Sequence, residues 1–265
     1  MVMTVLLFSI GGIIALLSII GYMRWTAARE RLLIHHFTIP SASDGQFSFV
    51  FISDIHRRTL SRQWIERVRK AGNVDFVIIG GDLAERGVPL ERIRHNVTEL
   101  SQFGPVYYVW GNNDREIGEE TMRTLLQERR VMILDNDVYP LRHHEQWCIG
   151  GTDDPSSGRT DVQRVVQRSE RYRHFLYVSH SPILFPKIKT WRRPDVQLAG
   201  HTHGGQIRLG PIGLYAHGSV TRTDGTYTVI SNGYGTTAVP LRFGALPEAH
   251  YVTITYGREE GGNEQ

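Results

Sequence analysis

Residues 196–205 read Val-Gln-Leu-Ala-Gly-His-Thr-His-Gly-Gly, a short apolar run that stops at two histidines framed by glycines. An apolar run of this length, bounded by glycine, is typical of a strand buried on both faces. The loops at the ends of such strands stay open, so His201 and His203 are candidate ligands of a metal or a phosphate. The stretch predicts a strand that delivers functional side chains from its carboxyl end.

Five other segments of the chain repeat this arrangement. They are Phe47–Ile52 before Ser53-Asp54-Ile55-His56, Phe76–Ile79 before Gly80-Gly81-Asp82, Val106–Trp110 before Gly111-Asn112-Asn113-Asp114, Trp147–Ile149 before Gly150-Gly151-Thr152-Asp153-Asp154, and Phe175–Val178 before Ser179-His180-Ser181-Pro182. Runs rich in Val, Ile, Phe and Tyr are typical of strands. Side chains that are far apart in sequence can therefore converge on one crevice at the strand ends.

Amphipathic segments alternate with these strands. Apolar residues recur at helical spacing in Arg62–Lys70, Leu90–Phe103, Glu119–Arg130 and Asp161–Arg173. After Gly205 the pattern changes to short strand-like segments at Gln206–Leu209, Thr226–Ser231 and His250–Thr255. With 265 residues and 40% hydrophobic content, the chain is long enough for one well-filled core. The sequence predicts one α/β domain over residues 45–256 with a strand-rich end.

The amino-terminal segment predicts a membrane anchor. Met1 to Met23 contains no charged side chain, and at about 1.5 Å per residue it can span a hydrocarbon core of roughly 30 Å. Basic residues follow the apolar stretch rather than precede it, which favours an uncleaved transmembrane helix over a signal peptide. The arginines after it place the domain in the cytoplasm. We expect an anchor over 1–23, a juxtamembrane linker over 24–44, and a polar tail over 257–265.

Composition narrows the chemistry. The single cysteine, Cys148, lies in an apolar run, which excludes a disulfide framework and a cysteine-based zinc site. Any metal must therefore be held by His, Asp and Asn. The net charge is only +3, and no basic patch interleaved with aromatic residues indicates nucleic-acid binding. No feature predicts a protein partner.

The order of the strand-end residues resembles the calcineurin-like metallophosphoesterase family over roughly Asp44 to Tyr256. The residues that carry the resemblance are Asp54, His56, Asp82, Asn112, His180, His201 and His203. The chain is most similar to a membrane-anchored bacterial branch of that family, through Gly204-Gly205-Gln206, Ser231-Asn232-Gly233-Tyr234-Gly235, Leu241-Arg242-Phe243 and Pro247-Glu248. The resemblance implies two packed mixed β-sheets flanked by helices.

The resemblance also implies two metal ions, with one site made by Asp54, His56 and His203 and the other by Asn112, His180 and His201. Asp82 would bridge both and act in catalysis. The residue types agree with this independently, because carboxylate and imidazole ligands suit Mn, Fe, Zn or Co. Two such cations can generate a hydroxide and orient a phosphoryl group.

One position departs from the family pattern. The usual Gly-Asn-His-Asp reads Gly111-Asn112-Asn113-Asp114 here, so Asn113 replaces a catalytic histidine. Asparagine cannot deliver a proton at neutral pH, so we hypothesise a substrate with a good leaving group, such as the phosphate of a pyrophosphate bond. Asp114 and Glu85 either orient ligand histidines or cap turns.

The function that these observations favour is a membrane-tethered phosphoesterase that uses a metal-bound hydroxide on a phosphodiester or pyrophosphate bond. Its substrate would be a phosphorylated small molecule, a lipid or a glycolipid. Two alternatives stay open: a nucleotide phosphodiesterase, and a non-catalytic, metal-stabilised binding module at the membrane. His217, Arg222 and Arg242 either contact substrate or serve the structure.

Overall fold

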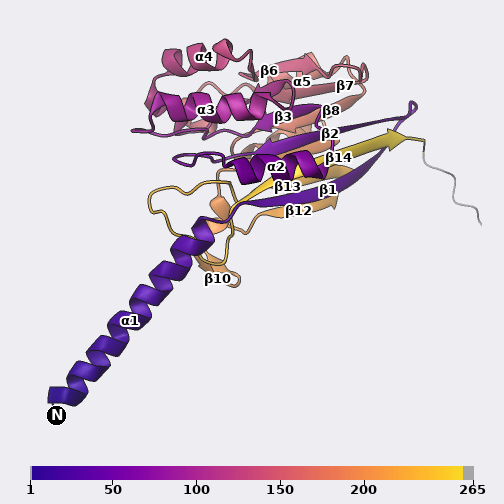
Figure 1. The fold of residues 1–265 in the computed structure, drawn as a ribbon. Coiled ribbons are helices and arrows are strands. Elements are labelled where there is room, and N and C mark those ends of the chain that lie inside the picture. The colour runs from indigo at the N-terminus through magenta and orange to yellow at the C-terminus, as the bar shows by residue number, and fades with distance from the viewer. Residues whose placement is uncertain (1, 259–265) are drawn as a thin grey trace, which may run out of the picture.

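Two six-stranded sheets face each other at the centre of the computed structural model, which describes residues 2–258 (Figure 1). The first sheet has the order β1 (Arg31–Pro40), β14 (Glu248–Gly257), β2 (Gly45–Ile52), β3 (Phe76–Ile79), β4 (Val106–Tyr108) and β5 (Met132–Ile133). Strands β2 to β5 are parallel, β14 is antiparallel to β2, and β1 is parallel to β14. The carboxyl ends of β2, β3 and β4 therefore lie side by side.

The second sheet is also a mixed sheet of six strands. Its order is β12 (Ser219–Thr223), β13 (Thr226–Ile230), β9 (Val196–Ala199), β8 (His174–Val178), β7 (Trp147–Gly151) and β6 (Asp137–Pro140). The four central strands are parallel, and the two edge strands β12 and β6 are antiparallel to their neighbours. A separate small hairpin joins β10 (Arg208–Leu209) to β11 (Ile212–Gly213).

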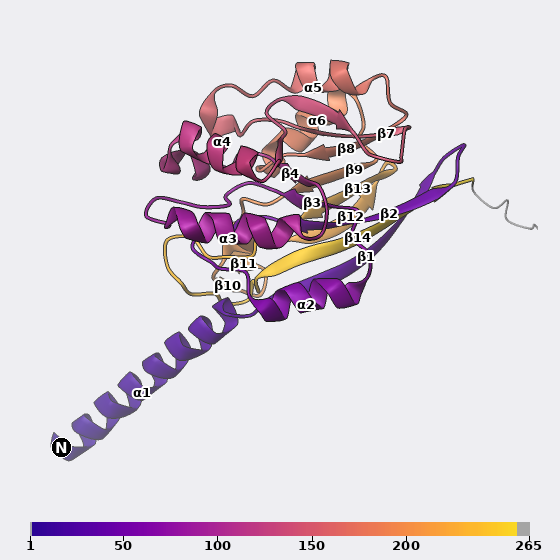
Figure 2. The same cartoon turned by 45° about the horizontal axis from the view of Figure 1, so that its top comes forward.

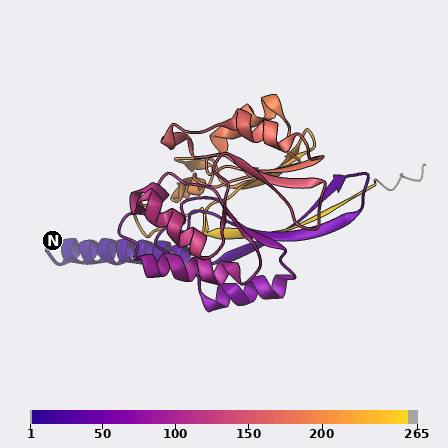
Figure 3. The same ribbon diagram turned by 90° about the horizontal axis from the view of Figure 1, so that it is seen from above.

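Helices cover the outer face of each sheet, so the layers run helix, sheet, sheet, helix (Figure 3). Helices of the first layer are α2 (Arg62–Ala71), α3 (Leu90–Ser101) and α4 (Glu119–Glu128), and those of the second are α5 (Val162–Ser169) and α6 (Phe185–Trp191). Short 3-10 turns follow several strands, at Asp114–Ile117, Pro155–Ser157, Pro182–Leu184 and His203–Gly205. This confirms the predicted fold class and all four predicted helices.

Both faces of the central strands of each sheet are buried, which explains why these strands read as continuous apolar runs. In β2, Phe49 and Phe51 face the second sheet, where Trp147 and Leu198 belong to the same core cluster. The alternate residue Val50 faces the helices of the first layer. Each buried side chain of this size contributes about 2 kcal/mol to folding. All six predicted strands are present, and Cys148 is buried as expected.

The predicted linker over 24–44 is wrong at its centre. Residues Arg31–Pro40 form β1, which pairs in parallel with β14 along its whole length. Only part of β1 is buried, and its central His35-His36 pair is polar, so its sequence lacks the apolar run of a central strand. Of the predicted polar tail, Gly257 ends β14, and residues 259–265 lie outside the described part of the chain.

The amino-terminal helix leaves the domain as one long rod (Figures 1 and 2). It is α1 (Val2–Ala27), which is long and apolar enough to cross a membrane, and it extends past the predicted end at residue 23. Its last turn contacts the domain: the carbonyl of Met23 accepts a hydrogen bond of 3.1 Å from the backbone N–H of Arg242. The side chain of Thr26 is buried and donates to the carbonyl of Arg242.

Candidate metal centre

The strand ends of both sheets meet at one edge of the sandwich. The first sheet brings Asp54 and His56 after β2, Asp82 after β3 and Asn112 after β4; the second brings His180 after β8, and His201 and His203 after β9. The structure thus brings together all seven residues that the sequence suggested as ligands. The acidic pair after β7 is elsewhere, since Asp153 pairs with Arg115 at 2.8 Å.

Asp54, His56 and His203 form the first cluster, with ligand atoms within 4.8 Å of one another. The Nε2 atoms of His56 and His203 are 3.1 Å apart, and Nε2 of His203 is 3.3 Å from Oδ1 of Asp54. All three side chains are buried. These nitrogens and oxygens present lone pairs to a common point, which is the arrangement a cation would satisfy.

Asp54, Asp82 and His180 form the second cluster, which Asn112 and His201 extend. The Oδ1 atom of Asn112 lies 3.2 Å from Nε2 of His180 and 3.0 Å from Nδ1 of His201. The two imidazole nitrogens are 3.1 Å apart. The other nitrogen of His180 lies 2.9 Å from the carbonyl of Gly80, which orients the ring.

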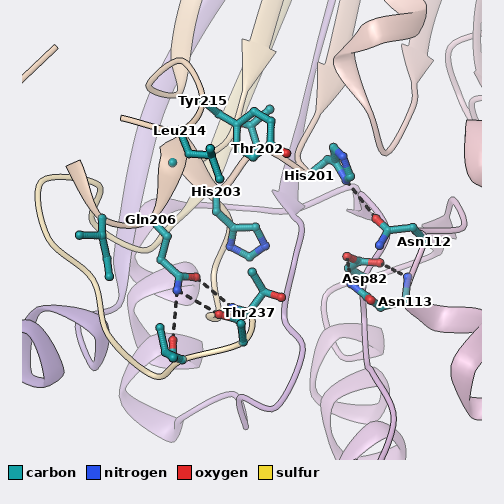
Figure 4. A pocket seen from close by; sticks show the side chains of 14 residues that line it. Asp82, Asn112, Asn113, His201, Thr202, His203, Gln206, Leu214, Tyr215 and Thr237 are labelled. Carbon is teal, nitrogen blue, oxygen red and sulfur yellow. Dashed lines mark hydrogen bonds between the residues drawn. The ribbon is translucent and has the colours of Figure 1, made fainter. Parts of the chain in front are cut away.

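Asp82 lies between the two clusters. Its Oδ2 atom is 3.6 Å from Nε2 of His56 and 3.4 Å from Nε2 of His180. Asn113 holds this carboxylate through two hydrogen bonds, one of 2.8 Å from its backbone N–H and one of 2.7 Å from its side-chain amide. Figure 4 shows Asn113 directed at Asp82. In this conformation the amide of Asn113 positions the carboxylate, and the residue is also part of the cavity wall.

The electrostatics of the site favour ionised carboxylates. Burial opposes ionisation of Asp82, yet His180 beside it holds the pKa of that carboxyl well below its usual range. Burial also opposes protonation of His180, but the charge of Asp82 outweighs it and raises the pKa of His180 to about 10. Two buried carboxylates, Asp54 and Asp82, therefore require positive partners. Divalent cations fit this donor set of carboxylates, imidazoles and one amide oxygen.

The backbone at the site is strained. Positive φ angles occur at Asp54 (56°), His56 (50°), Asp82 (49°), His201 (70°) and His203 (50°). For residues other than glycine, this left-handed conformation costs of order 1–3 kcal/mol each and is concentrated at functional sites. The sharp turns it produces aim consecutive side chains back into one crevice. No residue-type pattern in the sequence signals this conformation.

Close packing at the strand ends explains one of the glycines. A Cβ atom on Gly200 would lie 2.2 Å from Oδ2 of Asp54. The backbone N–H of His201, the next residue, donates to both oxygens of Asp54 at 3.1 Å. A side chain at residue 200 would separate the carboxylate of the first sheet from the backbone of the second.

The two acidic residues next to the site have different roles. Glu85 lies 2.9 Å from Nδ1 of His56, opposite the nitrogen that faces the first cluster, so it orients a ligand histidine. Asp114 instead accepts hydrogen bonds from the backbone N–H groups of Asp82, Ala84 and Gly111 at 2.8, 3.1 and 2.8 Å. Burial and the nearby charge of Asp82 raise the pKa of Asp114 to about 6.

A cavity of about 500 Å³ opens beside the clusters. Asp82, Asn112, Asn113 and His201 line one side, and His203 lies between them and Gln206 (Figure 4). The rest of the wall consists of side chains that sequence reasoning missed: Thr202, Gln206, Ile207, Leu214, Tyr215, Thr237, Ala238 and Val239. The amide of Gln206 holds this wall together by donating to the carbonyls of Thr237 and Val239 at 3.0 and 3.1 Å. Only Gly204-Gly205-Gln206 in the sequence pointed toward it.

The three residues considered for substrate contact do not line this cavity. Arg242 is completely buried, and its guanidinium donates to the carbonyls of His203, Asn232 and Gly235, with Nη2 3.1 Å from Nδ1 of His203. It is a structural brace behind a ligand histidine. Arg222 lies on exposed β12 over the ring of Tyr227, and His217 is exposed beside Gly218.

Comparison with known proteins agrees with this geometry. A sequence profile described as calcineurin-like phosphoesterase matches residues 47–205, which is more than half of the chain and includes every clustered residue. The chain belongs to the calcineurin-like phosphoesterase family. It is therefore a metal-dependent enzyme that hydrolyses phosphoesters, as the sequence predicted.

Relatives of this phosphoesterase cover most of its length. The uncharacterized protein YpbG of Bacillus subtilis is 37% identical over 244 residues, which are 91% of this chain and 94% of YpbG. Phosphodiesterase YaeI of Escherichia coli is 25% identical over 213 residues, which are 76% of this chain and 77% of YaeI. A putative 5'-nucleotidase from Staphylococcus aureus shares the fold with a TM-score of 0.51 at 13% identity, over 72% of this chain and 49% of that chain.

Proposed function

We propose that this phosphoesterase binds two divalent cations, is tethered to the cell membrane by α1, and cleaves a phosphodiester or pyrophosphate bond. The position of Asp82 carries the proposal, because one carboxylate oxygen lies within 3.6 Å of His56 in one cluster and 3.4 Å of His180 in the other. Asp54, His56 and His203 would hold one cation, and Asn112, His180 and His201 the other. Asp82 would bridge them.

The cations would be Mn, Fe, Zn or Co, which accept nitrogen and oxygen ligands together. Two cations supply a water molecule of lowered pKa and neutralise the charge that builds up on the phosphoryl group. Asp82 would set their separation, and Asn113 and the backbone held by Asp114 keep this carboxylate in place. Thr202 is part of the cavity wall, and its buried hydroxyl has no hydrogen-bond partner among the described residues.

Two observations support a particular kind of substrate. Asn113 can donate a hydrogen bond but not a proton, which favours a leaving group that needs no general acid, such as a phosphate or an acidic alcohol. The cavity wall opposite the clusters includes Ile207, Leu214 and Val239, which favours an apolar part next to the phosphoryl group. A phosphorylated lipid or glycolipid combines both properties.

The anchor sets the location. At about 1.5 Å per residue, the 26 residues of α1 exceed the thickness of a hydrocarbon core. Arg24 and Arg29 follow the apolar stretch, and this excess of positive charge supports a catalytic domain on the cytoplasmic face.

The test uses the full chain in detergent, stripped of metal by a chelator and assayed on a soluble aryl phosphodiester with and without Mn²⁺. We expect turnover that depends on Mn²⁺ and is lost in Asp82→Ala. Asp161→Ala is the matched control, because Asp161 caps α5 through the backbone N–H of Arg164 at 2.9 Å, away from the clusters. Bound metal without turnover would overturn the proposal in favour of a binding module.

The role of Asn113 has its own test. We expect Asn113→His to increase turnover of esters with poor leaving groups more than turnover of those with good ones, because the imidazole supplies the missing proton. Equal effects on both classes of ester would contradict the explanation.

A further inference from the structure

The β10–β11 hairpin exposes an apolar surface next to the anchor. Leu209, Ile212 and Leu214 are 68%, 75% and 82% exposed, and Tyr215 beside them is half exposed. In Figures 1 and 2 the hairpin lies on the side of the domain from which α1 leaves. Large apolar side chains grouped in this way mark a surface that contacts a partner or a membrane.

Specific contacts fix the hairpin relative to the end of α1. The backbone N–H of Arg208 donates to the carbonyl of Phe243 at 2.8 Å, and the ring of Phe243 packs edge-on against Tyr22 at 6.0 Å. Tyr22 and Trp25 are exposed aromatic residues at the carboxyl end of the apolar helix. Aromatic residues in that place mark the boundary between bilayer and water. The hairpin therefore begins at the level of this boundary.

The charge and the hydrogen bonds of the hairpin also suit its transfer from water into an apolar phase. From Gln206 to Ala216 its single charged side chain is Arg208, which is buried. The guanidinium donates to the carbonyls of Gly210, Pro211 and Tyr215 at 2.8, 3.1 and 3.1 Å. Backbone carbonyls that would otherwise need water are thus satisfied internally, which is the condition for entering an apolar phase.

We propose that residues Leu209–Tyr215 insert into the same leaflet of the bilayer as the end of α1 and hold the mouth of the cavity at the lipid surface. Leu214 and Tyr215 belong both to this hairpin and to the cavity wall. An amphiphilic phosphoester can then pass from the leaflet to the clusters while its apolar part stays against these side chains. The inference rests on the proposed function through the anchor.

The charges around the end of α1 agree with a lipid surface. Arg24, Arg57 and Arg58 line a hollow between α1 and residues 235–240. Within this segment, residues 237–239 line the cavity. Arg29 is exposed over the ring of Trp25. Arginines at this level attract the anionic headgroups of the cytoplasmic leaflet.

Site-directed fluorescence tests the insertion. Cys148 is buried, so a cysteine introduced at the surface of the full chain can be labelled selectively. Labels on Ile212→Cys, on Leu17→Cys in α1 and on Gln163→Cys in α5 are compared in vesicles of phosphatidylcholine and phosphatidylglycerol with nitroxide-labelled acyl chains. Gln163 is exposed on α5, far from α1 in Figures 1 and 2. We expect strong quenching at residues 17 and 212 and little at 163.

Each other pattern has a definite meaning. Quenching at residue 17 with residue 212 no more quenched than residue 163 would overturn the insertion of the hairpin and leave the anchor intact. Absence of quenching at both 17 and 212 would overturn the hairpin and the anchor together. Quenching at residue 212 that disappears when protein concentration is raised would indicate that a second copy of the chain covers the hairpin, which also contradicts the proposal.

A kinetic comparison separates this inference from the proposed function. Leu209 and Ile212 do not line the cavity, so a Leu209→Ser/Ile212→Ser variant should keep its turnover of a soluble aryl phosphodiester. We expect kcat/KM for a phospholipid ester embedded in vesicles to fall at least about tenfold, because interfacial contact is weakened. Equal losses on both substrates would overturn the insertion. If the wild type hydrolysed neither ester, the proposed function would fail while the quenching result would still stand.

Discussion

The two sheets contribute different chemistry to the metal centre. The first sheet carries both carboxylates, Asp54 and Asp82, whereas the second carries only imidazoles, from His180, His201 and His203. Neither sheet alone has a complete set of ligands, so each cluster exists only when the sandwich is assembled. Metal binding and sheet packing are therefore thermodynamically coupled, because a metal ion that requires ligands from both sheets stabilises their association.

Metal removal should have the largest effect on the association of the two sheets. At a free Mn²⁺ concentration of 100 times the dissociation constant, we expect the free energy of unfolding to rise by about 2.7 kcal/mol for one site, and by more for two. Urea denaturation of the full chain in detergent, with Mn²⁺ or with a chelator, measures it. The increase should vanish in Asp82→Ala. Identical denaturation curves for the wild type under both conditions would show that the cations do not join the sheets.

Asp114→Asn tests the brace within the first sheet. The carboxylate accepts three backbone N–H groups, from Asp82, Ala84 and Gly111, and an amide offers only one accepting oxygen. We expect the metal-free chain to lose about 2–3 kcal/mol of stability, since at least one buried donor is left unsatisfied. Chemical denaturation with chelator present provides the measurement. A variant as stable as the wild type would rule out the bracing role.

A pH titration tests the first sheet by itself, because this sheet contains a buried histidine, His250, away from the clusters. Burial, with help from His35 and Arg31, lowers the pKa of His250 on β14 to about 3, against 6.5 when unfolded. The unfolded chain therefore binds the extra proton below pH 6.5, and stability falls as pH decreases toward 3. Between pH 7 and pH 5 this amounts to about 2 kcal/mol.

The variant His250→Phe isolates that contribution. Its ring can pack against Phe51, whose centroid lies 5.9 Å from that of His250. Denaturation at pH 7 and pH 5 should show a loss for the wild type that exceeds the loss for the variant by about 2 kcal/mol. Equal losses would mean that His250 does not control the acid sensitivity of the sheet.

Glu85→Gln should have the smallest effect. Glu85 lies 2.9 Å from Nδ1 of His56 and thereby increases the basicity of the ring as a ligand. We expect metal affinity to fall about tenfold, or about 1.4 kcal/mol, while the metal-free chain keeps its stability. Isothermal titration with Mn²⁺ measures the affinity. Glu85 also forms an ion pair with Arg57, and unchanged affinity together with lower stability would make this pair its main role.

The central strands and the clustering of the candidate ligands could be predicted because buried parallel strands are apolar on both faces and end in functional loops. Asp153 shows the limit of this reasoning. It follows β7 just as Asp82 follows β3, but β7 lies one strand further from the crevice, and strand order is not encoded locally. β1 was not predicted, because an edge strand that is half exposed lacks the apolar run of a central strand.

The cavity wall escaped prediction for a different reason. Ile207, Leu214 and Val239 face Asp82 only because the chain folds back after β9, and no periodicity in residues 206–241 records that path. The burial of Arg242 could not be predicted either, because the carbonyls that accept hydrogen bonds from its guanidinium come from other segments of the chain. Residue types identify ligands, but the surfaces that select a substrate depend on tertiary contacts.

Arg242 gives the anchor a second significance. Its backbone N–H and carbonyl bond to Met23 and Thr26 of α1, and its guanidinium touches His203. A single residue therefore connects α1 to the candidate metal centre. Proteolytic removal of α1 would therefore not leave an equivalent enzyme, because it would remove the residues that support Arg242 behind a candidate ligand histidine and would thereby attenuate the enzyme.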